Sequence, residues 1–208
     1  INFFFVVLDG SNGFRIDEVA QDYLFGSSVS NVGDINGDGF DDILMGALRD
    51  APSPCGSNPL YIVYGSATMA GQTYLLPVDD LAFQTDGVPS FMAVVCYTSP
   101  ADYMGLTLAV GDFDGDGHDD FAAGFGDIGP FANMVVFGNT LEPGQATVLD
   151  GLGSNNAQIS GGSHVGYTLG SGDINGDGFD DVVLGDIQSI SGANGWDAYI
   201  VYGHASLM

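Results

Sequence analysis

The sequence predicts an all-β fold made of three repeated, four-stranded antiparallel blades. Three observations support this prediction: short runs rich in Val, Ile and aromatic residues, glycine-containing turns between these runs, and one motif that occurs three times. A repeat of roughly 60 residues with short strands and regular turns is typical of β-blades that stack side by side. Helical periodicity is nearly absent, apart from a short pattern near residues 16–23.

The repeated motif is a nine-residue acidic loop that begins at Asp34, Asp112 and Asp173, and these starting points lie 78 and 61 residues apart. Each copy has Asp or Asn at positions 1, 3, 5 and 9 and glycine at positions 4 and 6. Alternate side chains can point inward together, and glycine permits the positive-φ backbone of a tight loop. Ca²⁺ is held by about six to eight oxygens. Three spaced copies therefore predict three calcium sites, whereas a single copy would be read as a solvated Asp-Gly turn.

The predicted ligands are the side chains at positions 1, 3, 5 and 9 and the backbone carbonyl at position 7. They are Asp34, Asn36, Asp38, Phe40 and Asp42 in the first loop, Asp112, Asp114, Asp116, His118 and Asp120 in the second, and Asp173, Asn175, Asp177, Phe179 and Asp181 in the third. The imidazole of His118 is expected to face solvent.

These loops differ from the helix-flanked calcium loop that ends in a bidentate glutamate. Position 12 is Met45, Ala123 or Leu184, so that ligand is absent. The residues that follow position 9 are apolar and β-prone, which indicates that each loop joins two strands.

Composition restricts the function. The chain of 208 residues has no Lys, two Arg and 27 acidic residues, for a formal charge of −25. Nucleic acid and anionic membranes are therefore unlikely partners, because binding phosphate requires Lys or Arg. The longest apolar run, residues 3–8, is much shorter than the roughly 20 residues of a membrane span and is not an intact signal peptide. A start at Ile1 favours a processed mature protein or an excised fragment.

The repeat extends beyond the loop. An apolar residue and glycine precede each copy, a strand ending in an aromatic residue and glycine follows it, and Asp-Gly pairs lie upstream at residues 9–10, 86–87 and 150–151. We expect the outer strand of each blade to lead into the next Asp-Gly pair. The predicted organisation is an N-terminal strand at 1–8 followed by repeats at 9–75, 76–148 and 149–208.

At these residues the chain resembles the FG-GAP repeat family. The matching pattern is Phe25-Gly26, then the acidic loop from Gly33, then a Val/Ile-rich strand and Gly46-Ala47. The resemblance implies calcium-binding blades of the integrin α-subunit propeller type, also found in bacterial surface proteins, and implies the same metal ligands in all three loops. The second repeat departs from the pattern, with Met104-Gly105 and Gly124-Phe125. Propellers of this type serve many roles, so ligand recognition does not follow.

Three blades are fewer than the roughly four to eight of a closed propeller. We therefore expect residues 1–8 to complete a blade of a neighbouring chain by strand addition, which gives a homo-oligomeric ring or a filament. The alternative is that the chain is part of a longer, seven-bladed propeller.

The sequence contains no recognisable catalytic constellation, so we expect a non-enzymatic protein. Its predicted role is that of a secreted or cell-surface, calcium-stabilised structural or adhesive protein. The alternative is a module that binds a surface protein or a glycan, for which Trp196 is a candidate stacking residue. Cys96 lies in an apolar run typical of a small buried side chain, while a disulfide with Cys55 stays open.

Overall fold

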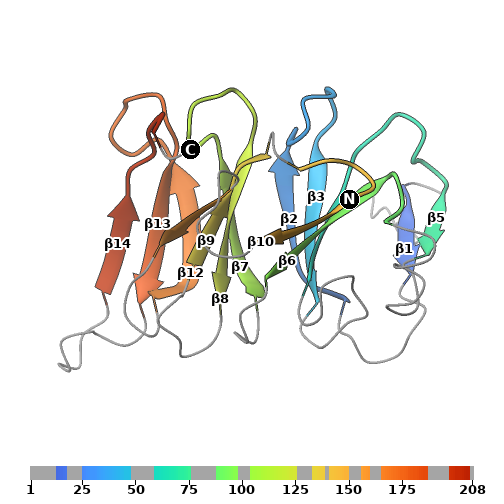
Figure 1. The fold of residues 1–208 in the computed structure, drawn as a ribbon, viewed down its shortest axis with the longest axis horizontal. Helices are drawn as coiled ribbons and strands as arrows, with labels where there is room; N and C mark the ends of the chain where they lie inside the picture. Colours follow the sequence, from blue (N-terminus) through green and yellow to red (C-terminus); the bar gives the residue numbers. More distant parts are fainter. Residues whose placement is uncertain are drawn as a thin grey trace, which may run out of the picture.

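The computed structural model describes residues 13–17, 25–47, 59–75, 88–97, 104–125, 133–138, 141–149, 156–159, 165–186 and 197–206. These residues form strands β1 to β14 and contain no α-helix, as the predicted fold class requires. The strands assemble into sheets that follow one another along the long axis of the molecule (Figure 1). The predicted N-terminal strand at residues 1–8 lies outside the described residues.

The first blade contains four antiparallel strands and a fifth, parallel strand at its outer edge. Its antiparallel strands are β2 (Phe25–Gly33), β3 (Asp42–Ala47), β4 (Leu60–Val63) and β6 (Met92–Tyr97), in that spatial order. Strand β10 (Ala146–Leu149) pairs with β6 in parallel, so this sheet has one strand more than the predicted four.

The second blade is four-stranded and antiparallel, as predicted. Its strands are β7 (Met104–Gly111), β8 (Asp120–Phe125), β9 (Asn133–Val136) and β11 (Asn156–Ile159). The third blade contains β12 (Val165–Gly172), β13 (Asp181–Asp186) and β14 (Asp197–Val201), three strands in the described part of the chain. A separate parallel pair joins β1 (Arg15–Asp17) and β5 (Thr73–Leu75), so residues 16 and 17 of the short helical pattern are in a strand.

The blades are offset from the sequence repeats. Strands β6 and β11, which close the first two blades, follow the Asp-Gly pairs at residues 86–87 and 150–151. This order differs from the expectation that the outer strand precedes each pair. The strands that do precede the pairs, β5 and β10, run parallel to an outer strand instead. The first two blades thus take their outer strand from the beginning of the next sequence repeat.

Two apolar cores lie between the blades. Phe121 and Ala123 of the second blade pack against Leu44 and Ile62 of the first. Val182 and Leu184 of the third blade pack in the same way against the second, in a cluster that also holds Phe113 and Phe137. Strands β2, β7 and β12 neighbour one another, so the first strands of the blades lie in a row. These side chains alternate along the strands, which is how each sheet supplies apolar residues to both of its faces.

Cys96 is buried in a third apolar cluster on the other face of the first blade, together with Tyr61 and Met92. Its burial agrees with the sequence, but its sulfur is in a disulfide, so the interpretation as a small unbonded side chain is wrong. The other cysteine of the chain, Cys55, lies outside the described residues.

Candidate metal centre

The three acidic loops occupy the same edge of the molecule. They are residues 34–42, 112–120 and 173–181, and they join β2 to β3, β7 to β8 and β12 to β13 (Figure 1). Both glycines of every loop have positive φ: Gly37 72° and Gly39 91°, Gly115 76° and Gly117 91°, Gly176 78° and Gly178 94°. The loops therefore share one backbone path, which glycine makes possible at these two positions.

The carboxylate at position 1 organises the backbone of each loop. Asp34 accepts hydrogen bonds from the amides of Asp38, at 2.9 Å, and Gly39, at 2.8 Å. Asp112 and Asp173 accept the equivalent bonds from positions 5 and 6, and a further one from the glycine at position 4. These bonds hold the chain in a curl with the side chains of positions 1, 3 and 5 on its inner side.

In the second loop three carboxylates converge. One oxygen each from Asp112, Asp114 and Asp116 lies within 4.8 Å of the other two. Asp114 is 3% exposed, and its Oδ2 is buried without a hydrogen-bond partner. Burial raises the pKa of the Asp114 carboxyl, and the neighbouring Asp116 and Asp112 raise it further. Buried polar atoms are ordinarily satisfied, so a cation bound here would supply the missing partner.

The first and third loops have asparagine at position 3. The Nδ2 groups of Asn36 and Asn175 donate to Asp38 at 3.1 Å and Asp177 at 2.9 Å. Their Oδ1 atoms accept the amide of the same position-5 residue. These residues therefore lie in the same loop curl as the position-1 carboxylates. Each Oδ1 has a second lone pair with which it could bind a cation.

The aspartate at position 9 has a second role that the sequence alone did not indicate. Asp42, Asp120 and Asp181 are at most 1% exposed. Each accepts the amide of loop position 2 and the amide of the glycine after the third strand, at 2.8–3.1 Å. The repeated aromatic-Gly ending of the third strand was the available signal, because this glycine donates to the loop. A carboxylate that accepts two amides still has lone pairs for a cation.

Burial also changes the protonation of these carboxyl groups. It raises the pKa of Asp42 to about 6 and that of Asp120 to about 7, although the two accepted amide bonds lower both. The other acidic residues of the loops add to the increase. A bound divalent cation would favour the ionised carboxylates and reverse this effect.

The amino-acid sequence itself matches known proteins in this region. The family model described as FG-GAP repeat matches residues 25–76, which include β2, the first acidic loop, β3 and β4. Residues 25–76 are therefore an FG-GAP repeat. FG-GAP repeats form β-propeller blades, which agrees with the stacked sheets observed here.

The chain is also similar to integrin alpha-PS2 of Drosophila melanogaster, with 29% identity over 127 residues. The match covers 61% of this chain and 8% of the integrin, so the chain corresponds to a small part of that relative. The likeness agrees with blades of the propeller type. The described residues include no helix with the length and apolar character needed to cross a membrane.

Adjacent blades are joined through loop positions 7 and 8. At position 8, Asp180 accepts the amide of Asp112 at 3.1 Å and returns its own amide to the Asp112 carbonyl at 3.0 Å. Asp119 likewise accepts the amide of Asp34. Position 8 was not among the predicted site residues, and its repetition in every copy was the signal that could have identified it.

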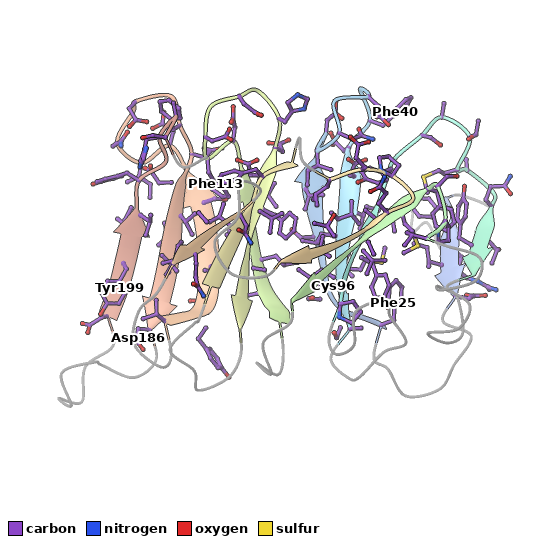
Figure 2. All side chains as sticks on the ribbon, viewed as in Figure 1. Phe25, Phe40, Cys96, Phe113, Asp186 and Tyr199 are labelled. Atoms are coloured by element: carbon purple, nitrogen blue, oxygen red, sulfur yellow. The ribbon has the colours of Figure 1, made fainter. Side chains whose placement is uncertain are left out.

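The side chain at position 7 also contacts the preceding FG-GAP blade. Phe179 lies against Gly115, and His118 lies against Gly37. The expectation that the His118 imidazole faces solvent is wrong, because its Nδ1 is buried. Phe40, the corresponding residue of the first loop, is 43% exposed and projects from the loop edge (Figure 2). Trp196, the candidate stacking residue, lies outside the described residues.

Proposed function

We propose that this FG-GAP chain is an extracellular, calcium-stabilised structural or adhesive module that holds one Ca²⁺ in each acidic loop. The observation that carries the proposal is the buried, unpartnered Oδ2 of Asp114 among three converging carboxylates. The ligands in each loop are the side chains at positions 1, 3, 5 and 9, with the position-7 carbonyl. Calcium suits this donor set because it accepts oxygen ligands only and tolerates a flexible loop.

The charge of the molecule supports the same role for the cation. Three Ca²⁺ ions would reduce the formal charge from −25 to −19. Metal binding to a site that exists only in the folded chain adds its binding free energy to folding. The cation would therefore stabilise the end of each blade at which neighbouring blades are joined by positions 7 and 8.

An extracellular location is supported by the disulfide at Cys96, because disulfides persist in oxidising compartments. The integrin relative provides a second, independent argument for a surface or adhesion setting. Head-to-tail self-assembly, as a ring or a filament, is part of this proposal.

The test is thermal unfolding in calcium and in EDTA, together with calorimetric titration of calcium. At a hundredfold excess over the dissociation constant, one site adds about 2.7 kcal/mol, or roughly 5–10 °C in a chain of this size. We expect a larger increase in melting temperature and a stoichiometry of three. The matched control is magnesium, which is smaller and dehydrates reluctantly, so its effect should be weaker. Equal melting temperatures in calcium and EDTA, with no heat of binding, would refute the proposal.

A further inference from the structure

The outer face of the third blade exposes apolar side chains that the other blades bury. Ile174, Ile200 and Tyr202 are 52%, 47% and 54% exposed. The strand pairing places them in register with Ile35, Ile62 and Tyr64 of the first blade and Phe113, Val135 and Phe137 of the second. All six of these equivalents are at most 5% exposed, and the blade that follows covers them. The face on the third blade is therefore shaped for a further FG-GAP blade.

The outer edge of the third blade matches a strand pair at the other end of the molecule. In the first blade β4 pairs with β6, and β10 then pairs in parallel with β6. The β1–β5 pair reproduces the β6–β10 pair: Arg15 and Val94 each donate an amide to a glutamine carbonyl at 3.0 Å, from Gln72 and Gln145 respectively. Strand β1 is thus the equivalent of an outer strand.

Neither of these two edges is completed by the described residues. Strand β1 pairs with β5 alone, and β14 pairs with β13 alone. They lie at opposite ends of the row of sheets, with β14 at one end and β1 and β5 at the other (Figure 1). The order β10-β6-β4-β3-β2 of the first blade would be reproduced by β5 and β1 of one molecule next to β14, β13 and β12 of another.

The acidic loops provide matching contacts at the same two ends. In the first and second loops the glycine at position 4 is packed: a Cβ added to Gly37 or Gly115 would touch the position-7 ring of the next loop. The equivalent Gly176 of the third loop has open space, since a Cβ added there would meet nothing within 4 Å. In the described part of the chain no carboxylate accepts the amide of Asp173. The first loop carries the complementary groups, the exposed ring of Phe40 and the carboxylate of Asp41.

We propose that the third blade binds the first blade of a second copy of this chain, head to tail, with β1 of that copy pairing antiparallel to β14. The β4–β6 register gives the pairs Ala198 with Ile16, Tyr199 with Arg15, and Ile200 with Phe14. Arg15, one of two cations in the chain, then lies diagonal to Asp197, within reach of a long side chain. A second copy is the chosen occupant because the chain itself carries both halves of the contact. The inference rests on the proposed structural role and assigns the strand exchange to β1.

The test uses three variants that each add one negative charge. Ile200→Glu alters the third-blade face. Val29→Glu alters the opposite face, which belongs to the first blade. Val29 is 61% exposed, and the strand pairing places it in register with Leu108 and Leu169 of the other blades. Leu108 and Leu169 pack against the preceding blade. Gln145→Glu is the control, at an exposed side chain away from both faces. Tyr202→Ser is a second, uncharged variant of the third-blade face.

We expect light scattering of the full chain in calcium to show a mass that rises with concentration in whole multiples of the monomer. Ile200→Glu, Tyr202→Ser and Val29→Glu should each remain monomeric, and Gln145→Glu should assemble like the parent chain. An equimolar mixture of Ile200→Glu and Val29→Glu should form a dimer, because each variant retains one intact face. Circular dichroism and melting in calcium confirm that every variant is folded.

A parent chain that stays monomeric while it binds calcium would overturn this inference together with the self-assembly part of the proposed function. The calcium-stabilised module of that proposal would still stand. Assembly of Ile200→Glu at the level of the parent would equally overturn it, since the contact would then lie elsewhere. Assembly of Val29→Glu at the level of the parent, with only the third-blade variants impaired, would also overturn the inference, because it would show a symmetric contact between third blades in place of the head-to-tail one. A parent chain that does not bind calcium would instead refute the proposed function.

Discussion

Asp120 shows how one residue can serve both the fold and the proposed metal site. It is 1% exposed and accepts the amides of Phe113 at 3.0 Å and Gly138 at 2.8 Å. The first bond fixes the start of the acidic loop, and the second fixes the end of the third strand. Replacing Asp120 by alanine would leave both donors buried without an acceptor.

We expect Asp120→Ala to lower the free energy of unfolding by about 2–4 kcal/mol, because an unsatisfied buried donor costs about 1–3 kcal/mol. Urea denaturation in EDTA measures this loss without a contribution from calcium. Glu142→Ala is the matched control, since the Glu142 side chain is exposed and its removal should change stability by less than about 0.5 kcal/mol. Equal midpoints for the two variants would show that the two amide bonds do not stabilise the blade.

Asp114→Asn gives the second loop the Asp-Asn-Asp arrangement of the other two loops. In EDTA we expect the variant to be more stable than the parent, because a neutral amide replaces a buried carboxylate whose pKa is raised by desolvation. In calcium we expect weaker binding at this loop, by about tenfold, which corresponds to about 1.4 kcal/mol. Urea titrations in the two conditions, with calorimetry, measure both effects. Calcium affinity of the second loop that is unchanged in calorimetry would contradict a metal-ligating role of Asp114.

At the scale of the elements, two glycine-to-alanine variants distinguish the packing between loops from the positive-φ backbone that glycine permits. Gly115 has φ 76° and lies against Phe179, whereas Gly176 has φ 78° and open space around its Cα. Both Gly→Ala variants place a Cβ on a positive-φ backbone, which costs about 1–2 kcal/mol. We expect Gly115→Ala to lose more than Gly176→Ala, because only the former also displaces an aromatic ring. Urea denaturation of dilute protein compares them, and equal losses would show that the second and third loops are not packed together.

The elements differ in how far the sequence determines them. The hairpins around the three loops were predictable, because their signals are local: β-prone runs, glycines at positions 4 and 6, and alternate acidic side chains. The outer strands were not. Strand β6 pairs with β4 across nearly thirty residues and with β10 across about fifty, and no local pattern marks such partners. The position-8 contact between loops was hidden for the same reason, since Asp119 and Asp34 meet only when the blades stack.

At the scale of the whole molecule, the excess of acid makes stability depend on pH when calcium is absent. Burial raises the pKa of Asp42 from 3.8 to about 6 and that of Asp120 from 3.8 to about 7. The folded chain holds these protons at pH values where the unfolded chain has released them. The stability that the protonated Asp42 and Asp120 side chains allow is therefore fully present below pH 3.8 and is lost as pH rises through about 6 to 7.

In EDTA we therefore expect the urea midpoint to fall between about pH 4 and pH 7. In calcium the fall should be smaller, because the cation favours the ionised form. General repulsion among carboxylates acts in the same direction, so Asp120→Asn is the control and should show a shallower fall in EDTA. A midpoint that rises with pH in EDTA would mean that the two carboxyl groups are ionised in the folded chain at low pH.

Strand exchange along the chain also affects how the molecule comes apart. Strand β10, from the segment that precedes the third sequence repeat, is paired to the first blade, so the peptide chain interlocks units that a simple tandem array would leave separate. The first blade cannot separate from the segment that carries β10 without breaking the β6–β10 pair. Unfolding should accordingly be a single concerted event, and a protease cut between β9 and β10 should leave two fragments that remain associated until denaturant separates them.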